Sequence, residues 1–132
     1  MSTPEPRQAL YAYLLANNGV KDVVGDRIHQ GRIPTGAAKP LLLIQPPISR
    51  VSERYLRGVA YKRTRLQVTA IADTQGQAEQ AANAVISAVE GFVGSMSGVT
   101  IIEATVDNDR QIAQDGIDET HHHVDVMVMY KG

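Results

Sequence analysis

The fold is decided by the stretch THHHVDVMVMY at residues 120–130. Apolar side chains recur at every second position in its second half, namely Val124, Val126, Val128 and Tyr130. The residues between them are His123, Asp125, Met127 and Met129. Because successive side chains of a β-strand point to opposite faces, this alternation predicts a strand with one buried face and one more polar face.

The residues before this stretch predict a second half-buried strand and a helix. Residues 61–72 alternate in the same way, with Leu66, Val68, Ala70 and Ala72 on one face and Arg63, Arg65, Gln67 and Thr69 on the other. From residue 74 small apolar residues follow a helical spacing, at Ala78, Ala81, Ala82, Val85, Val89 and Phe92. Asp73 or Thr74 can cap the start of this helix, and Gly91 or Gly94 can end it.

The remaining segments complete the predicted order of elements. We expect a helix from about Pro6 to Asn17 that stops at Gly19, an ordered loop over residues 25–36 and a strand between Pro40 and Ile48. Residues 94–98 read as a flexible turn and residues 99–106 as a strand. The sequence therefore predicts an α+β fold in the order helix-strand-strand-helix-strand-strand. Two helices would lie on one face of a mainly antiparallel four-stranded sheet.

Length and composition narrow the class of protein. A chain of 132 residues has the size of a single domain, which we expect to span residues 1–132. The absence of cysteine excludes a disulfide scaffold, a thiolate metal site and a cysteine nucleophile. A net charge of −1 argues against a general nucleic-acid binder. The N-terminus does not read as a secretory signal, and the longest aliphatic run, at residues 41–44, is far too short to span a membrane, so a cytosolic start is expected.

The histidines are the main candidates for chemistry. In a strand, His121 and His123 share a face while His122 points to the other side. A metal site needs three or four ligands, and Asp125 is the only further candidate nearby at the same parity, so no metal and no cofactor are expected. Neither a calcium loop after Asp107 nor a nucleophile elbow is complete in the sequence, which predicts a protein without catalytic residues.

Charge is segregated along the chain. Residues 50–65 carry a net +5 from Arg50, Arg54, Arg57, Lys62, Arg63 and Arg65 against one acidic residue. Residues 103–119 carry a net −5, with Asp107, Asp109, Asp115, Asp118 and Glu119 as the candidate contact residues. The two blocks are either solvated loops or the two halves of a contact between copies of the chain. A nucleic-acid patch is the third reading, although it lacks stacking aromatics beyond Tyr55 and Tyr61.

Several short segments, taken in order, resemble one known family. They are Val24-Gly25-Asp26-Arg27-Ile28, Gly31-Arg32-Ile33-Pro34, Pro40-Leu41-Leu42, Arg65-Leu66-Gln67-Val68 before the alanine-rich helix, and Val124-Asp125-Val126 before Tyr130. In this order the chain resembles the small tail completion, or tail terminator, proteins of long-tailed bacteriophages and related prophages. It departs from them at His29, where relatives commonly carry an aromatic residue, and in its three consecutive histidines.

The resemblance implies a structural protein of the virion rather than an enzyme. Members of that family form a ring, usually a hexamer, that caps the tail tube and meets the neck of the head. The implied partners are further copies of the chain, the tail tube protein and the head-neck connector, with no membrane and no sequence-specific nucleic acid. The implied location is the tail–head junction, after assembly in the bacterial cytoplasm. The alternatives are a small cytosolic metal-binding protein or enzyme that uses His29, His121 and His123, and a regulatory or binding module of the host.

Overall fold

The described residues of the chain form three helices and seven strands in an α+β arrangement. The computed structural model describes residues 6–34, 36–45, 49–56, 59–96, 98–113 and 119–131. The helices are α1 (Pro6–Ala16), α2 (Asn18–Val24) and α3 (Gln75–Val89). The strands are β1 (Ile28–Gln30), β2 (Leu41–Ile44), β3 (Ser49–Leu56), β4 (Val59–Ala72), β5 (Phe92–Met96), β6 (Val99–Ala113) and β7 (Thr120–Lys131).

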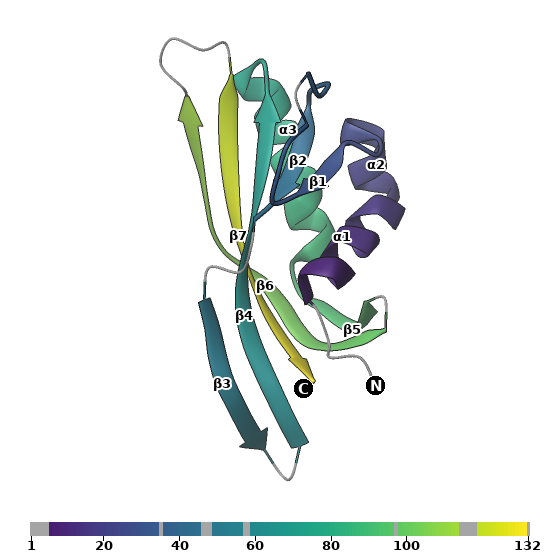
Figure 1. Ribbon diagram of the computed structural model, residues 1–132, viewed down its shortest axis with the longest axis vertical. Helices are drawn as coiled ribbons and strands as arrows, with labels where there is room; N and C mark the ends of the chain where they lie inside the picture. The colour runs from purple at the N-terminus through teal and green to yellow at the C-terminus, as the bar shows by residue number, and fades with distance from the viewer. Residues whose placement is uncertain are drawn as a thin grey trace.

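All seven strands belong to one sheet. Its order is β1-β2-β4-β7-β6-β5, and β3 pairs with the first half of β4. Only β1 and β2 are parallel, and every other pair is antiparallel. Figure 1 shows the three helices on the same side of this twisted sheet, while β3 and the paired part of β4 extend beyond them as an arm. The helices therefore cover one face of the sheet. The other face is called the open face below, although Leu41, Leu43, Thr69 and Ile71 on it are buried.

The predicted fold class is confirmed, but the predicted number of elements is wrong. Four strands and two helices were expected, whereas seven and three are described. Part of the expected loop at residues 25–36 forms β1, and most of the expected turn at residues 94–98 belongs to β5. The polar strand β3 was not expected, and β6 continues past residue 106 to Ala113.

The first helix ends differently from the prediction because Asn17 begins a second helix. The Asn17 side chain accepts a hydrogen bond from the backbone N–H of Val20 at 3.1 Å, which is the geometry of an N-cap. Gly19 therefore lies inside α2, and Gly25 with φ of 62° follows the last turn of α2. The chain thus makes two short helices where one was expected.

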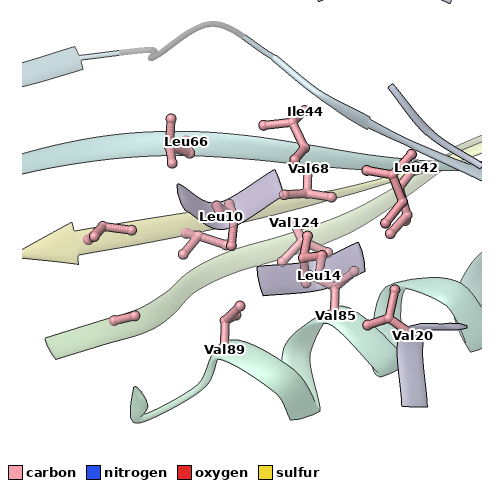
Figure 2. Close-up of a cluster of buried hydrophobic side chains, with 14 of the residues drawn as sticks. Leu10, Leu14, Val20, Leu42, Ile44, Leu66, Val68, Val85, Val89 and Val124 are labelled. Carbon is pink, nitrogen blue, oxygen red and sulfur yellow. The ribbon is translucent and has the colours of Figure 1, made fainter. Parts of the chain in front are cut away.

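Helix α3 lies close to the sheet because its inward face is built from small residues. Thr74 is its N-cap and accepts a hydrogen bond from the backbone N–H of Gln77 at 3.2 Å. The buried residues of α3 are Ala78, Ala81, Ala82, Val85 and Val89, as the spacing predicted. Phe92, the last residue of the predicted stripe, is not helical and begins β5, because α3 ends at Val89. Figure 2 shows Val85 and Val89 facing Leu10 and Leu14 of α1 within the same cluster as Val124 of β7. Burial of this cluster supplies the main stabilisation of the fold.

The alternation predicted for the two central strands is confirmed. On β4 the residues Leu66, Val68, Ala70 and Ala72 are buried, and on β7 Val124, Val126, Val128 and Tyr130 are buried. The two strands pair over their whole shared length, from Tyr61 opposite Lys131 to Ala72 opposite Thr120. In the part of the chain that the structure describes, no helix is long and apolar enough to cross a membrane.

Candidate functional site

The open face of the sheet carries a line of polar side chains. His121 and His123 lie on this face, as predicted, and His122 points to the other side. His123 Nδ1 is 2.9 Å from the hydroxyl of Thr69 on the neighbouring strand β4. His121 Nε2 is 2.7 Å from a carboxylate oxygen of Glu119. The backbone pairing of β4 with β7 sets these contacts, since Thr69 stands opposite His123 in the register.

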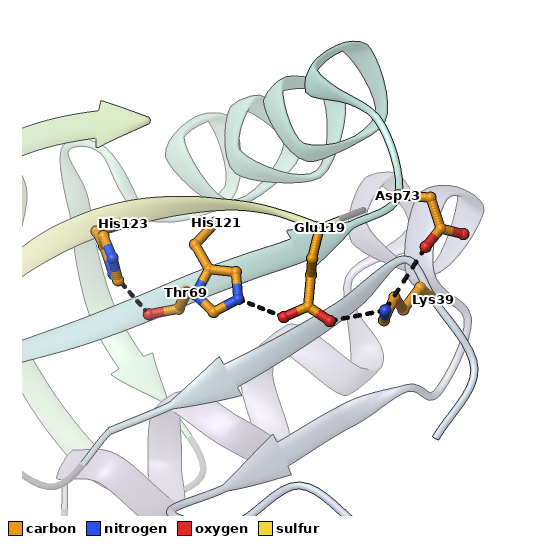
Figure 3. A network of polar contacts seen from close by, with 6 residues as sticks. All are labelled: Lys39, Thr69, Asp73, Glu119, His121 and His123. Carbon is orange, nitrogen blue, oxygen red and sulfur yellow. Dashed lines mark hydrogen bonds and ion pairs between the residues drawn. The ribbon is translucent and has the colours of Figure 1, made fainter. Parts of the chain in front are cut away.

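Lys39 extends this line across the sheet. Its ammonium lies 2.7 Å from Glu119 and 3.6 Å from Asp73, so that Lys39, Glu119, His121 and Asp73 form one polar network (Figure 3). The hydrogen bond from Lys39 lowers the pKa of Glu119, and the contact with His121 lowers it further. The same hydrogen bond raises the pKa of Lys39. Each charge in this network is met by an opposite charge or a hydrogen bond, which is the arrangement of a structural network.

The surroundings of His123 disfavour its charged form. Burial lowers the pKa of its imidazole, and electrostatic interactions with Arg110 and His121 lower the pKa further. A neutral imidazole can exchange a hydrogen bond with the Thr69 hydroxyl in either tautomer. His123 therefore contributes to the pairing of β4 and β7 through its contact with Thr69.

The histidines considered as an alternative metal or catalytic set are not brought together. His29 lies on β1, and both β2 and β4 separate it from β7. The rings of His121 and His123 are 6.2 Å apart, but each faces its own partner, Glu119 or Thr69. Among the described residues, no group of three or more His, Asp or Glu side chains is placed to hold a metal ion.

A small pocket lies beside the polar network. It has a volume of about 270 Å³ and is lined by Ile33, Pro34, Gly36, Ala37, Lys39, Leu41, Ile71 and Glu119. Arg27 supports its rim by donating a hydrogen bond from Nε to the carbonyl of Pro40 at 2.8 Å. The two charged residues that line the pocket, Lys39 and Glu119, form an ion pair with each other, so the lining carries no net charge.

The basic block lies mostly on the β3–β4 arm. Arg50 and Arg54 belong to β3, and Lys62, Arg63 and Arg65 belong to β4. Arg57 lies outside the described residues. Five of the 13 Lys and Arg residues of the chain therefore lie on the arm, which Figure 1 shows at one end of the sheet.

The described part of the acidic block is divided: its β6 residues lie toward the edge of the sheet opposite β3, whereas Glu119 contacts Lys39 beside β2. Asp107 and Asp109 belong to β6, Glu119 immediately precedes β7, and Asp115 and Asp118 lie outside the described residues. Asp107 forms an ion pair with Arg65 inside the same chain, and Asp109 accepts a hydrogen bond from His122 at 2.9 Å. The side chains of Asp107 and Asp109 are nevertheless 45% and 46% exposed. The two blocks thus meet once within the subunit and still present charge to the outside.

Sequence reasoning missed several residues of this surface. Lys39 lies just before β2, Thr69 lies on β4 and Asp73 follows β4, so no local pattern links them to Glu119. The signal for Thr69 was available, because it lies on the polar side of the alternating residues 61–72. The strand β3 was also not predicted, and it is important for contacts with other proteins because it forms one edge of the described sheet.

Two comparisons with known proteins show proteins similar to this chain, one by sequence family and one by structure. A family model described as Tail completion protein gp17 matches residues 8–131. Among solved structures, a chain described as "Virion of native gene transfer agent (GTA) particle" superposes with a TM-score of 0.80 at 18% sequence identity. The match covers 96% of this chain and 94% of that chain, so the whole fold is shared. A search of the curated proteins gives no match.

Proposed function

We propose, on the premise that the chain belongs to the Tail completion protein gp17 family, that it closes the end of a phage tail as a ring and joins the tail to the head. Membership of the family makes it a structural protein of the virion tail. The observation that carries the proposal is the family match over residues 8–131, which leaves only the extreme ends of the chain outside it.

Geometry explains why such a protein is needed. A tail tube is a stack of identical rings, and its end always offers the same sites to the next ring. Growth stops when a different protein covers those sites. A ring of this chain would fit the tube on one side and the neck of the head on the other, and it would end the tube because its second side differs from its first.

The open face and the edges of the sheet support this role. The helices cover one face only, and the polar network on the other face is neutralised internally. The arm and the acidic edge carry opposite charges at opposite edges of the sheet. A subunit with two different, complementary edges favours rings over two-fold symmetric dimers, because each contact joins one edge of one copy to the other edge of the next copy.

The proposal includes the partners and the place of assembly. They are further copies of the chain, most simply six, the tail tube protein and the head-neck connector protein. Assembly takes place in the cytoplasm of the bacterial host, from a phage or a prophage gene. One domain spans residues 1–132, which is supported by the single continuous cluster of buried side chains in the described residues.

Deletion of the gene tests the function. Without the protein, heads and tails would accumulate separately, and a fraction of the tails would have abnormal length. Purified protein added to such a lysate would restore joining. Electron microscopy distinguishes the outcomes: normal joined virions, or a defect confined to capsids or DNA replication, would contradict the proposal.

We also propose that the two charge blocks meet between copies of the chain. The candidate residues are Arg50, Arg54, Arg57, Lys62, Arg63, Arg65, Asp107, Asp109, Asp115, Asp118 and Glu119. The variants Arg54→Glu and Asp109→Arg would each weaken assembly onto tails, because each places like charges in the contact. Exposed ion pairs contribute only about 0.2–1 kcal/mol each, so these charges would select the partner while other contacts supply affinity.

A matched control separates the charge from the internal hydrogen bond of Asp109. The variant Asp109→Asn keeps an acceptor for His122 and removes only the negative charge. It should weaken assembly less than Asp109→Arg, and a mixture of Arg54→Glu with Asp109→Arg should assemble better than either alone. If neither charge reversal alters assembly, the two blocks are only solvated surface.

A further inference from the structure

We infer that neighbouring copies join by backbone pairing, with the free edge of β3 in one copy added to the free edge of β6 in the next. This inference rests on the proposed ring and specifies how its subunits contact one another. It goes beyond the charge blocks, because the contact would be a continuous β-sheet rather than a set of side-chain pairs.

The first observation is that half of β6 has an unpaired side. β5 pairs with residues 99–104 of β6 and covers its outer edge there. At Val106 the backbone N–H is instead bound by the Glu90 carboxylate at 2.7 Å, which marks the end of that cover. From Asp107 to Ala113, β7 is the only strand partner of β6 among the described residues. Such an edge presents backbone donors and acceptors that can pair with another strand.

The second observation is that β3 is a free edge of matching length. β3 has 8 residues, Ser49–Leu56, and pairs only with β4 within the described part of the chain. It lies on the arm, beyond the helices, so neither α1 nor α3 blocks its outer side (Figure 1). The open segment of β6, residues 107–113, is similar in length.

The direction of the strands also fits. Along the path β3, β4, β7, β6 each neighbouring pair is antiparallel, so β3 and β6 run in opposite directions. When β3 of a second copy continues the sheet beyond β6, the antiparallel alternation is kept. Antiparallel pairing also requires no crossover connection between the strands.

The charges decide which edges pair. The β3 strand carries a net +1, from Arg50 and Arg54 against Glu53, and the open segment of β6 carries a net −1, from Asp107 and Asp109 against Arg110. Like charges opposite each other destabilise a strand pair. β3 on β6 is the combination that joins strands of opposite net charge. It is a head-to-tail contact, the type of contact from which rings are built when the rotation between copies closes.

The two remaining edges are less suited to this role. β1 has only three residues. β5 shows a register shift between Phe92 and Gly94, and Gly94 has a φ of 133°, so this edge is irregular. Irregular and very short edges resist the addition of a further strand.

Introduced cysteines test the contact directly, because the natural chain contains none. Val51 stands opposite Arg63 and Arg110 stands opposite His123, so both register positions belong to the open face. Phage tails are assembled in cells that produce the full-length double variant Val51→Cys/Arg110→Cys in place of the natural protein. Further double variants replace Val51→Cys by Ser49→Cys, or Arg110→Cys by Asn108→Cys, to test neighbouring registers of the strand pair. After mild oxidation, non-reducing gels should show a ladder of covalent multimers that ends at the size of the ring.

The matched control moves one cysteine to the other face. Gln111 stands opposite His122, so Val51→Cys/Gln111→Cys places the two thiols on opposite faces of the sheet and should yield about tenfold less cross-linking. Correct tails without multimers in any open-face pair would overturn the inference and leave the proposed function intact. Cross-linked multimers together with normal virions after gene deletion would instead reject the proposed function and keep the contact.

Discussion

The two faces of β7 differ although their residues alternate within one strand. Val124, Val126 and Val128 face the helices and are at most 1% exposed. Met127 and Met129, on the open face, are only half-buried. The covered face therefore supplies most of the free energy of folding, while the exposed parts of the open face and the sheet edges are free to carry groups that serve contacts with other proteins.

Truncation of a side chain on the covered side should have the largest effect. Leu14 of α1 is fully buried in the cluster beneath the sheet. Leu14→Ala would remove that burial and leave a cavity, which lowers the free energy of unfolding by about 2–5 kcal/mol. Urea denaturation followed by circular dichroism measures the loss.

A truncation on the open face is the matched test of the comparison. Met129→Ala should lower the free energy of unfolding by under about 1 kcal/mol, because a half-exposed side chain loses little burial. Equal losses for the two variants would mean that the open face is as important to folding as the covered face, and the comparison would fail.

The same contrast explains which parts of the fold could be predicted. Residues buried on one face leave a period in the sequence, so β4, β7 and α3 were recognised from valines, leucines and alanines at regular spacing. The edge strands leave no such period. β1 lies in a segment rich in glycine, and β5 contains Gly94 and Ser95, which are typical of turns. These strands exist because neighbouring strands already offer them hydrogen bonds.

The candidate site was predictable only in part. The sharing of one face by His121 and His123 follows from the period of a strand, and the charge blocks follow from counting. Contacts such as Lys39 with Glu119 and Arg65 with Asp107 join residues that lie far apart in the sequence. They depend on the order of strands in the sheet, which local patterns do not contain.

The hydroxyl of Tyr13 offers a second, smaller test of the covered side. It donates a hydrogen bond to the carbonyl of Ala88 at 2.6 Å and so joins α1 to α3. Tyr13→Phe would leave that partly buried carbonyl without this donor and lower the free energy of unfolding by about 1–2 kcal/mol. Tyr11→Phe is the control, because the Tyr11 hydroxyl forms no hydrogen bond to any residue in the described ranges. Similar losses in both variants would assign the effect to ring packing instead.

The open-face network should make stability depend on pH more weakly. The folded state lowers the pKa of His123 below 6.5 by burial, so its neutral form stabilises folding above 6.5 and this contribution fades as the pH falls below 6.5. Glu119 has a folded pKa below 4.5 because Lys39 hydrogen-bonds to it, so its contribution is present above 4.5 and is lost at lower pH. The free energy of unfolding should therefore fall in two steps as the pH decreases from 7.

Two variants assign the steps. His123→Gln should flatten the change just below pH 6.5, and Glu119→Gln should flatten the change below pH 4.5, each without altering the other step. Thermal unfolding at a series of pH values provides the measurement. If both steps survive in both variants, the pH dependence comes from groups on the covered side or the edges.

The ion pair between Arg65 and Asp107 should have the smallest effect on the isolated subunit. It spans from β4 to β6 across β7 on the open side, and the two side chains are 29% and 45% exposed. Water screens such a pair, so a double-mutant cycle with Arg65→Ala and Asp107→Ala should give a coupling of about 0.2–1 kcal/mol that shrinks as salt is added. A coupling well above this range, or one that is insensitive to salt, would show that the open face is desolvated and contributes to folding like the covered face. A coupling within it, together with weakened assembly of Asp107→Ala onto tails, would show that Asp107 has its larger role at the edge of the sheet, where β6 is free to meet another copy.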